Sequence, residues 1–168
     1  MSRRRIAALT AASVGAMVGF LFWPLFSVLQ IVTSADGGVV FCARVRSGEE
    51  FVLSFVHSVN RRPVYDTLRV EDDHLVIVKS RFDSFGAGMP EASTQEGSLT
   101  VAEDGWLEWT VNRPTPEVTV RVGRVADHTL LCREKTVRLS DLAEPGSALT
   151  LRVRKSRWFN LIKDRCIP

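Results

Sequence analysis

The 168-residue sequence predicts an all-β domain, an antiparallel sandwich or small barrel of about 8–10 strands, preceded by one N-terminal transmembrane helix. Three observations predict this fold. From residue 39 onward, short runs rich in Val, Leu, Phe and Thr alternate with turn signals. No stretch after residue 36 keeps the 3.6-residue apolar period of an amphipathic helix over three turns. Before residue 36, an almost unbroken apolar stretch follows a cluster of three arginines.

The apolar stretch runs from Ile6 to Val32. As a helix it would span about 40 Å at about 1.5 Å per residue, more than the roughly 30 Å of a bilayer core. We interpret residues 1–35 as a cytoplasmic Arg cluster and a membrane anchor. A cleaved signal peptide is the alternative, although its apolar core usually spans only about 7–15 residues. Under both interpretations the arginines stay in the cytoplasm and the body faces the other side.

Ten strands are expected in the body, at 39–46, 51–57, 64–70, 75–82, 98–103, 106–111, 117–122, 128–133, 135–139 and 148–154. Asp104-Gly105 is the strongest turn signal between them, because this dipeptide favours a two-residue hairpin. The connection 83–97 is the longest irregular stretch, and such loops in compact domains are usually functional or disordered. The strands define an exported β domain at 36–155, and a basic and aromatic tail follows at 156–168.

The distribution of charge argues against a nucleic-acid binder. The chain carries a net charge of +3, but residues 36–151 hold 13 basic and 18 acidic side chains. Binding to nucleic acid would need a basic patch on the folded body. The basic and aromatic tail can instead lie at a membrane surface, or dock on its own domain or on a partner.

The cysteines support neither a metal site nor a redox motif. Cys42, Cys132 and Cys166 show no CxxC and no Cys/His ligand spacing. Cys42 and Cys132 both lie in apolar strand-like segments, so a disulfide between them is possible in an exported domain. The alternative is that both are reduced core residues; in either case Cys166 is the odd thiol. No glycine motif precedes a helix, so no nucleotide cofactor is expected.

The segments 51–57, 64–70 and 75–82 predict a meander whose first and third strands run in the same direction. The loops that follow His57 and Phe82 should therefore emerge at the same edge of the sheet. A register with His57 opposite Val64 places Asp66 diagonally from His57, within reach of a His–carboxylate hydrogen bond. Such a pair suits proton transfer or recognition of a polar group. The alternative is a structural histidine satisfied by Asp66.

The second loop contains the segment Ser84-Phe85-Gly86-Ala87-Gly88-Met89-Pro90. Its two glycines allow positive φ and a tight turn, whose N–H groups can form a nest for a carboxylate or phosphate. The alternative is a structural turn with Phe85 and Met89 packed on the core or on a partner. Arg61 and Arg62 border the site. They form either a solvated loop tip or a positively charged surface that attracts an anion.

An enzyme is not expected, because Ser58 faces away from His57 and no nucleophile elbow is present. The predicted ligand or partner contacts are His57, Ser58, Arg61, Arg62, Tyr65, Asp66, Ser84, Phe85, Gly86, Ala87, Gly88, Met89 and Pro90.

The order and spacing of His57-Ser58-Val59, Pro63-Val64-Tyr65-Asp66 and the segment 84–90 resemble the bacterial family called domain of unknown function 1850, over roughly residues 39–155. Asp66 stands where that family more usually has Glu, and the aspartate keeps the negative charge. The resemblance implies a context and no activity. Such proteins look like companions of tripartite ATP-independent periplasmic (TRAP) transporters of the TAXI type, which import organic acids with a soluble binding protein and a membrane permease.

We therefore expect a non-catalytic accessory subunit of such a transporter, anchored by a single span in the bacterial inner membrane with its C-terminal domain in the periplasm. Its expected partners are the TRAP permease, the TAXI solute-binding protein, or both. One alternative is a periplasmic module that binds an organic anion or a lipid. Another is an envelope hydrolase that uses His57 and Asp66.

Overall fold

The computed structural model describes residues 26–157 without a break, together with Ser13, Gly15, Gly19, Trp23, Asn160, Cys166 and Ile167. These residues form two antiparallel sheets and almost no helix, so the predicted all-β class is confirmed. The strands are β1 (Phe26–Thr33), β2 (Val39–Val45), β3 (Glu50–Val56), β4 (Pro63–Glu71), β5 (His74–Phe82), β6 (Ser98–Val101), β7 (Leu107–Thr115), β8 (Glu117–Arg121), β9 (Thr129–Cys132), β10 (Lys135–Arg138) and β11 (Ala148–Ser156). A single turn of 3₁₀ helix, η1 (Leu139–Asp141), follows β10.

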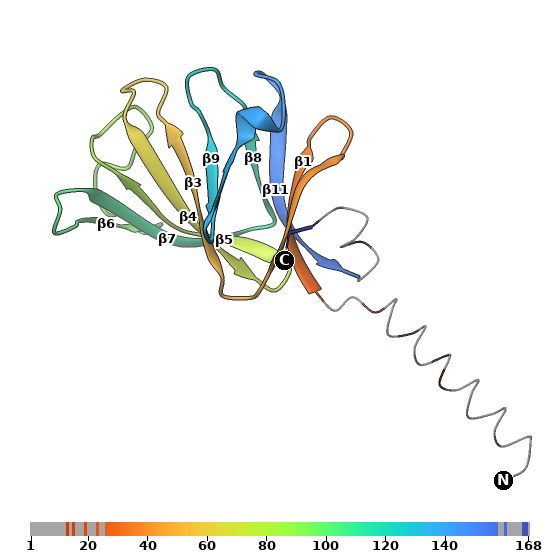
Figure 1. Ribbon diagram of the computed structural model, residues 1–168. Coiled ribbons are helices and arrows are strands. Elements are labelled where there is room, and N and C mark those ends of the chain that lie inside the picture. The colour runs from red at the N-terminus through yellow and green to blue at the C-terminus, as the bar shows by residue number, and fades with distance from the viewer. Residues whose placement is uncertain are drawn as a thin grey trace, which may run out of the picture.

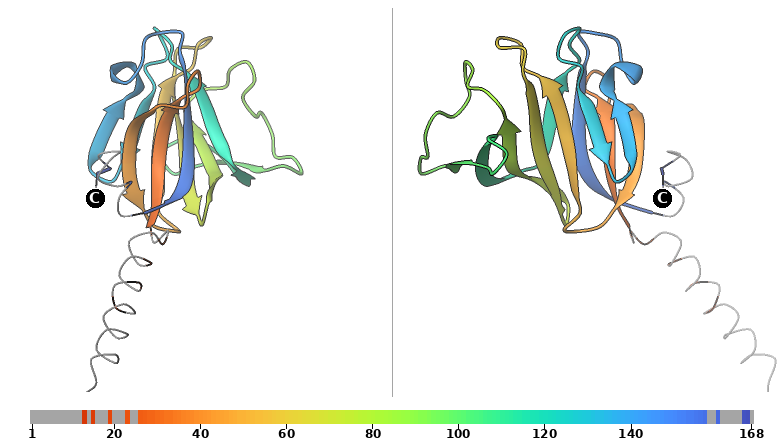
Figure 2. Two further views of the ribbon diagram at one scale, coloured as in Figure 1. Left: turned by 90° about the vertical axis from the view of Figure 1, so that its right-hand side faces the viewer. Right: turned by 60° about the vertical axis from the view of Figure 1, so that its left-hand side comes forward.

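The two sheets form a sandwich (Figures 1 and 2). The smaller sheet has the strand order β2-β1-β11-β8, and the larger has the order β10-β9-β3-β4-β5-β7-β6. The smaller sheet packs over the larger one where β11 and β8 lie against β5. The core between them is apolar and draws on both sheets. It includes Leu29, Ile31, Val45, Leu149, Leu151 and Val153 from the smaller sheet, and Phe51, Leu53, Leu68, Val70, Leu75 and Leu130 from the larger.

All ten predicted strands are present, and their ends differ from the prediction by a few residues. The largest difference is in β7, which continues to Thr115 beyond a bulge opposite Ile77–Lys79. The predicted hairpin at Asp104-Gly105 joins β6 to β7, and its backbone closes with a 2.8 Å hydrogen bond from the Ala102 N–H to the Trp106 carbonyl. The predicted long connection 83–97 joins β5 to β6.

An eleventh strand, β1, lies in a segment that the sequence pattern assigns to the membrane anchor at 1–35. β1 pairs with β2 on one side and with β11 on the other. Val28, Leu29 and Ile31 have no exposed surface. A strand buried on both faces is a continuous apolar run, which periodicity alone cannot distinguish from an apolar helix. Residues 26–33 therefore belong to the β domain, although the sequence pattern places them in the anchor segment 1–35.

The remainder of the predicted anchor lies mostly outside the described residues. Among the residues that are described, no helix is long and apolar enough to cross a bilayer.

The sandwich has two distinct ends (Figure 1). The base end carries the start of β1, where the Ser27 hydroxyl donates to the Asp72 carbonyl in the β4–β5 turn, at 3.4 Å. The loop end carries residues 57–62, 83–90 and 122–128. The third of these loops joins the others through a 2.8 Å hydrogen bond from the Val56 N–H to the Ala126 carbonyl. Since β3 has seven residues, the two ends are roughly 20 Å apart.

Candidate functional site

The two loops singled out by the sequence meet at the loop end. Gly86 lies so close to the β3–β4 loop that a Cβ atom at this position would be 2.7 Å from Asn60 Nδ2 and 3.4 Å from His57 Cε1. Any larger residue at position 86 must displace the Asn60 side chain. The absence of a side chain thus allows the glycine loop to lie against the His57 ring and the Asn60 amide.

Asn60 joins the two loops through its side-chain amide. Its Nδ2 donates to the carbonyls of Ser84 at 3.4 Å and Phe85 at 3.2 Å, and its Oδ1 accepts from the Arg62 N–H at 3.1 Å. A second link is the ion pair between the Arg62 guanidinium and the Asp83 carboxylate. Asn60 and Asp83 are not among the residues that the sequence predicts for the site. The sequence gives only a weak signal for Asn60, because asparagine is common in loops. Its side-chain amide can donate and accept hydrogen bonds at the same time, which suits a residue that joins two loops.

His57 closes the β3–β4 loop with its backbone. Its N–H donates to the Arg62 carbonyl at 2.9 Å, and its carbonyl accepts from the Arg61 N–H at 2.9 Å. Arg61 has a φ of 55°, which suits the tight turn, and its side chain is exposed. The ring Nδ1 lies 3.3 Å from the Val59 N–H and can accept from it. The exposed Ser58 has no part in this arrangement.

The glycine loop folds back on itself after Phe85. The Met89 N–H donates to the Gly86 carbonyl at 2.9 Å, and Gly88 has the positive φ, 81°, that the sequence suggests. Because the turn uses the Met89 N–H, that donor is not free for an anion. Ala87 and Gly88 are exposed, and Met89 and Pro90 are half-buried. The Phe85 ring packs edge-on against Phe82 with centroids 6.3 Å apart, yet 48% of its surface stays exposed.

The predicted contact between His57 and Asp66 does not form. In the observed register Val56 lies opposite Pro63 and Leu53 lies opposite Asp66. Asp66 is thus four residues along the strand from His57, a separation of roughly 13 Å. The faces were predicted correctly, because the register differs by two residues and an even shift preserves alternation. Asp66 faces the core side beside the buried Val64, whereas Tyr65 is exposed on the other side.

Asp66 instead pairs with the next strand. Its Oδ1 accepts a 2.6 Å hydrogen bond from the Ser80 hydroxyl on β5. Partial burial raises the pKa of the Asp66 carboxyl above its usual range, and the hydrogen bond from Ser80 offsets only part of this effect.

We expect Asp66→Asn to stabilise the fold at neutral pH, because the amide oxygen still accepts from Ser80 while the buried charge is removed. The raised pKa means that ionised Asp66 opposes folding above its folded pKa, and that this penalty disappears as pH falls through that pKa. The stability difference between the two proteins should therefore shrink on acidification. Urea unfolding at several pH values measures it. The exposed Asp141→Asn serves as the control, and a gap that widens toward acid would contradict the expectation.

Tyr65 belongs to a separate cluster on the outer face of the larger sheet. Its ring lies 5.7 Å from that of Trp106, and the Arg81 guanidinium lies 5.1 Å above the Trp106 ring. Arg81 also forms ion pairs with Asp104 and Glu108. Tyr65 therefore does not join His57, although the sequence places the two in one site.

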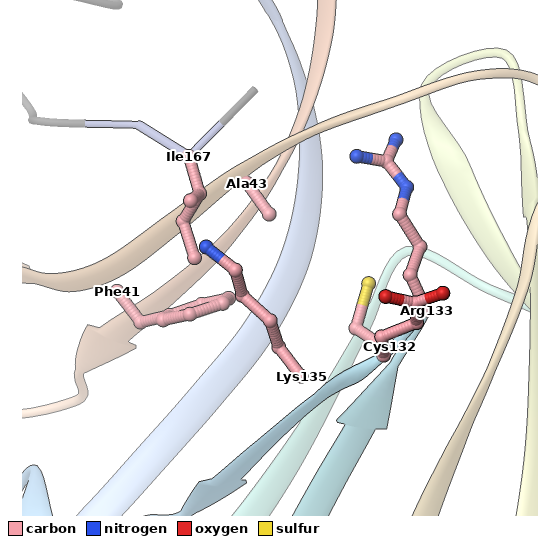
Figure 3. Close-up of a pocket in the computed structure, with 7 residues that line it drawn as sticks. Phe41, Ala43, Cys132, Arg133, Lys135 and Ile167 are labelled. Carbon is pink, nitrogen blue, oxygen red and sulfur yellow. The ribbon is translucent and has the colours of Figure 1, made fainter.

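The disulfide joins Cys42 to Cys166, and the predicted pairing of Cys42 with Cys132 is wrong. Strand alternation explains why. Phe41 and Ala43, which flank Cys42, line a cavity of about 290 Å³ together with Cys132, so the Cys42 side chain projects from the opposite face of β2. Figure 3 shows the Cys132 sulfur pointing into this cavity, below Ile167 and Ala43. Burial raises the pKa of the Cys132 thiol, which keeps it protonated.

The end of the predicted tail 156–168 docks on the domain itself. Ile167 adds a short parallel pairing to the edge strand β2, with hydrogen bonds of 2.9 Å to the Cys42 carbonyl and 2.8 Å from the Arg44 N–H. Ser156, placed in the tail by the sequence, completes β11. Most of the remaining tail lies outside the described residues.

The loop end has the chemistry of a recognition surface. Val59, Phe85 and Val125, one from each of its three loops, are exposed by 67%, 48% and 57%. Around them lie the His57 ring and the Arg62–Asp83 pair. Among the residues that the structure describes, no three His, Cys, Asp or Glu side chains group as ligands of a metal ion. Loops that are connected to one another and carry exposed apolar and charged side chains suit contact with another protein.

Comparison with known proteins points to one family. A family model described as a domain of unknown function, DUF1850, matches residues 51–139, more than half of the chain. The match includes both loops of the candidate site and Asp66. No curated protein and no solved structure matches the chain.

Proposed function

Because the chain belongs to the DUF1850 family, we propose that it is a non-catalytic accessory subunit of a TAXI-type TRAP transporter in the bacterial inner membrane. The apolar N-terminal segment anchors the base end, and the β domain lies in the periplasm. The loop end contacts the permease, the solute-binding protein, or both. Support comes from the apolar segment that precedes Phe26 and from the resemblance of the two loop motifs to proteins found with such transporters.

The observation that carries the proposal is the position of three exposed apolar residues. Val59, Phe85 and Val125 lie at the loop end, whereas the chain leads toward its apolar N-terminal segment from the base end. A domain tethered at its base thus presents Val59, Phe85 and Val125 away from the bilayer, where a partner can reach them. The Asn60 hydrogen bonds and the Arg62–Asp83 pair hold two of these loops in place before binding. Such preorganisation lowers the conformational entropy lost on association.

The test is recovery of the transporter with the full-length protein from gently solubilised membranes. Burial of one large apolar side chain contributes about 1.5–3 kcal/mol, and about 1.4 kcal/mol is a tenfold change in affinity. We therefore expect the double variant Val59→Glu/Phe85→Glu to recover at least about tenfold less permease or binding protein than the wild type.

Leu131→Glu is the matched control, since Leu131 is 44% exposed but lies in β9, within the sheet. It should retain binding, and thermal unfolding should show that all three proteins are folded. Recovery of neither transporter component by the wild-type protein would contradict the proposal. Equal recovery by the double variant would contradict the role of the loop end.

The organic-anion alternative finds less support at this site. Arg62 is already paired with Asp83, and the turn uses the Met89 N–H, so two of the expected anion donors are engaged.

A further inference from the structure

The larger sheet carries a second concave site, apart from the loop end. It lies on the core-facing side of β5 and β7, at the side of the sandwich where β8 is the edge strand of the smaller sheet. Ser80 of β5 pairs with Trp109 of β7, and the buried Phe82 lies on the same face of β5 as Ser80. This groove, defined by Ile77, Ser80, Glu96, Trp109, Val111 and Arg113, has a volume of about 420 Å³.

The floor of the groove is apolar, and its exposed edge carries two opposite charges. Ile77, Trp109 and Val111 provide the apolar surface. Arg113 and Glu96 are exposed, and neither forms an ion pair within the part of the chain that the structure describes. They also do not pair with each other, although both line the groove. The groove thus presents a guanidinium and a carboxylate that are available to a ligand.

Two further contacts shape the groove. A Cβ atom at Gly97 would lie 2.7 Å from the Trp109 ring, so the absence of a side chain allows the loop that carries Glu96 to press against this indole. Ser80 donates its hydroxyl proton to Asp66, so toward the groove the Ser80 oxygen can only accept. Glu96 and Ser80 therefore both favour a cationic donor, whereas Arg113 favours an anionic acceptor.

The volume of the groove, about 420 Å³, suits a small ligand. Small-molecule sites begin at about 300 Å³, and most are apolar with a few placed polar groups. The groove meets this description with three apolar side chains and three polar ones.

We propose that this groove binds a small zwitterion with an apolar body, the chemistry of a free apolar amino acid. Its carboxylate pairs with Arg113, its ammonium group pairs with Glu96 and the Ser80 oxygen, and its apolar side chain packs on Trp109. A ligand with both charged groups makes both contacts, so a ligand that has only one of them binds more weakly. This inference does not depend on the proposed transporter role, since it uses none of the loop-end residues.

The test is binding of L-leucine, L-methionine and L-phenylalanine to the full-length protein, measured by calorimetry and by the change in tryptophan fluorescence. At least one of the three should bind. Its N-acetyl derivative, which lacks the ammonium group, and its amide, which lacks the carboxylate, should each bind at least about tenfold more weakly. Trp109→Phe should remove the fluorescence change.

Variants that remove one charge from the groove show which residue binds the carboxylate of the ligand and which binds its ammonium group. Arg113→Gln should weaken binding of the amino acid at least about tenfold but leave the weak binding of its amide unchanged. Glu96→Gln should weaken binding of the amino acid and leave the weak binding of the N-acetyl derivative unchanged. Arg138→Gln, an exposed arginine on β10 at the opposite edge of the sheet, should bind as the wild type does. No binding of any of the three amino acids at millimolar concentration would overturn the proposal, as would an Arg113→Gln variant that matches Arg138→Gln.

Discussion

A chain that begins at Phe26 will fold, whereas a chain that begins at Asp36 will not. The second chain lacks β1, which lies between β2 and β11 in the smaller sheet and pairs with both. Its removal deletes Val28, Leu29, Ile31 and Val32, all of them 3% exposed or less. At about 1.5–3 kcal/mol for each buried side chain, the loss is about 6–12 kcal/mol, as large as the whole stability of a typical domain.

Circular dichroism and the dispersion of amide signals in NMR spectra distinguish the two outcomes. The chain from Phe26 should give a β spectrum and a cooperative unfolding transition, and the chain from Asp36 should give neither. In the longer chain Ile31→Ala should lower the free energy of unfolding by about 2–5 kcal/mol. Val39→Ala, at a position that is 37% exposed, should change it by no more than about 0.5 kcal/mol. Cooperative unfolding of the chain from Asp36 would show that the core does not need β1.

The fold was predictable wherever a strand has one face in the core and one toward solvent. In β8, for example, Val118 and Val120 are half-buried and alternate with exposed residues, so the pattern shows both the strand and its orientation. β1 lacks this alternation because the side chains on both of its faces are buried. Its segment merges with the apolar residues before it, and the pattern of apolar residues cannot show where one element ends and the next begins.

The convergence of the two loops was predictable for a similar reason. A meander of three strands brings the loops after β3 and β5 to one end, whatever the register. The predicted pairing of His57 with Asp66 depended on the register between β3 and β4. The alternation of apolar and polar residues does not fix this register, because a shift of two residues keeps every side chain on the same face. The true partner of Asp66 is Ser80, on a strand whose pairing with β4 contains a bulge between Thr67 and Leu68. A bulge of this kind leaves no clear mark in the sequence.

Removal of the Cys42–Cys166 disulfide should give the second large loss of stability. The bond joins residues 124 positions apart, and the chain-entropy relation for a loop of this length gives a contribution of about 4–5 kcal/mol. It also holds Ile167 against β2, which would otherwise expose an edge strand. We therefore expect Cys166→Ala to lower the free energy of unfolding in guanidinium chloride by several kcal/mol.

Three comparisons identify the pair that carries this effect. Cys42→Ala and Cys166→Ala should have similar effects, and the double variant should lose little more than either, because both single variants remove the same bond. A reductant should lower the free energy of unfolding of the wild type and leave that of these three variants unchanged. Cys132→Ala, which removes a buried thiol and keeps the bond, should cause a smaller loss and remain sensitive to reductant. If Cys166→Ala were as stable as the wild type while Cys132→Ala lost its response to reductant, the bond would join Cys42 to Cys132 instead.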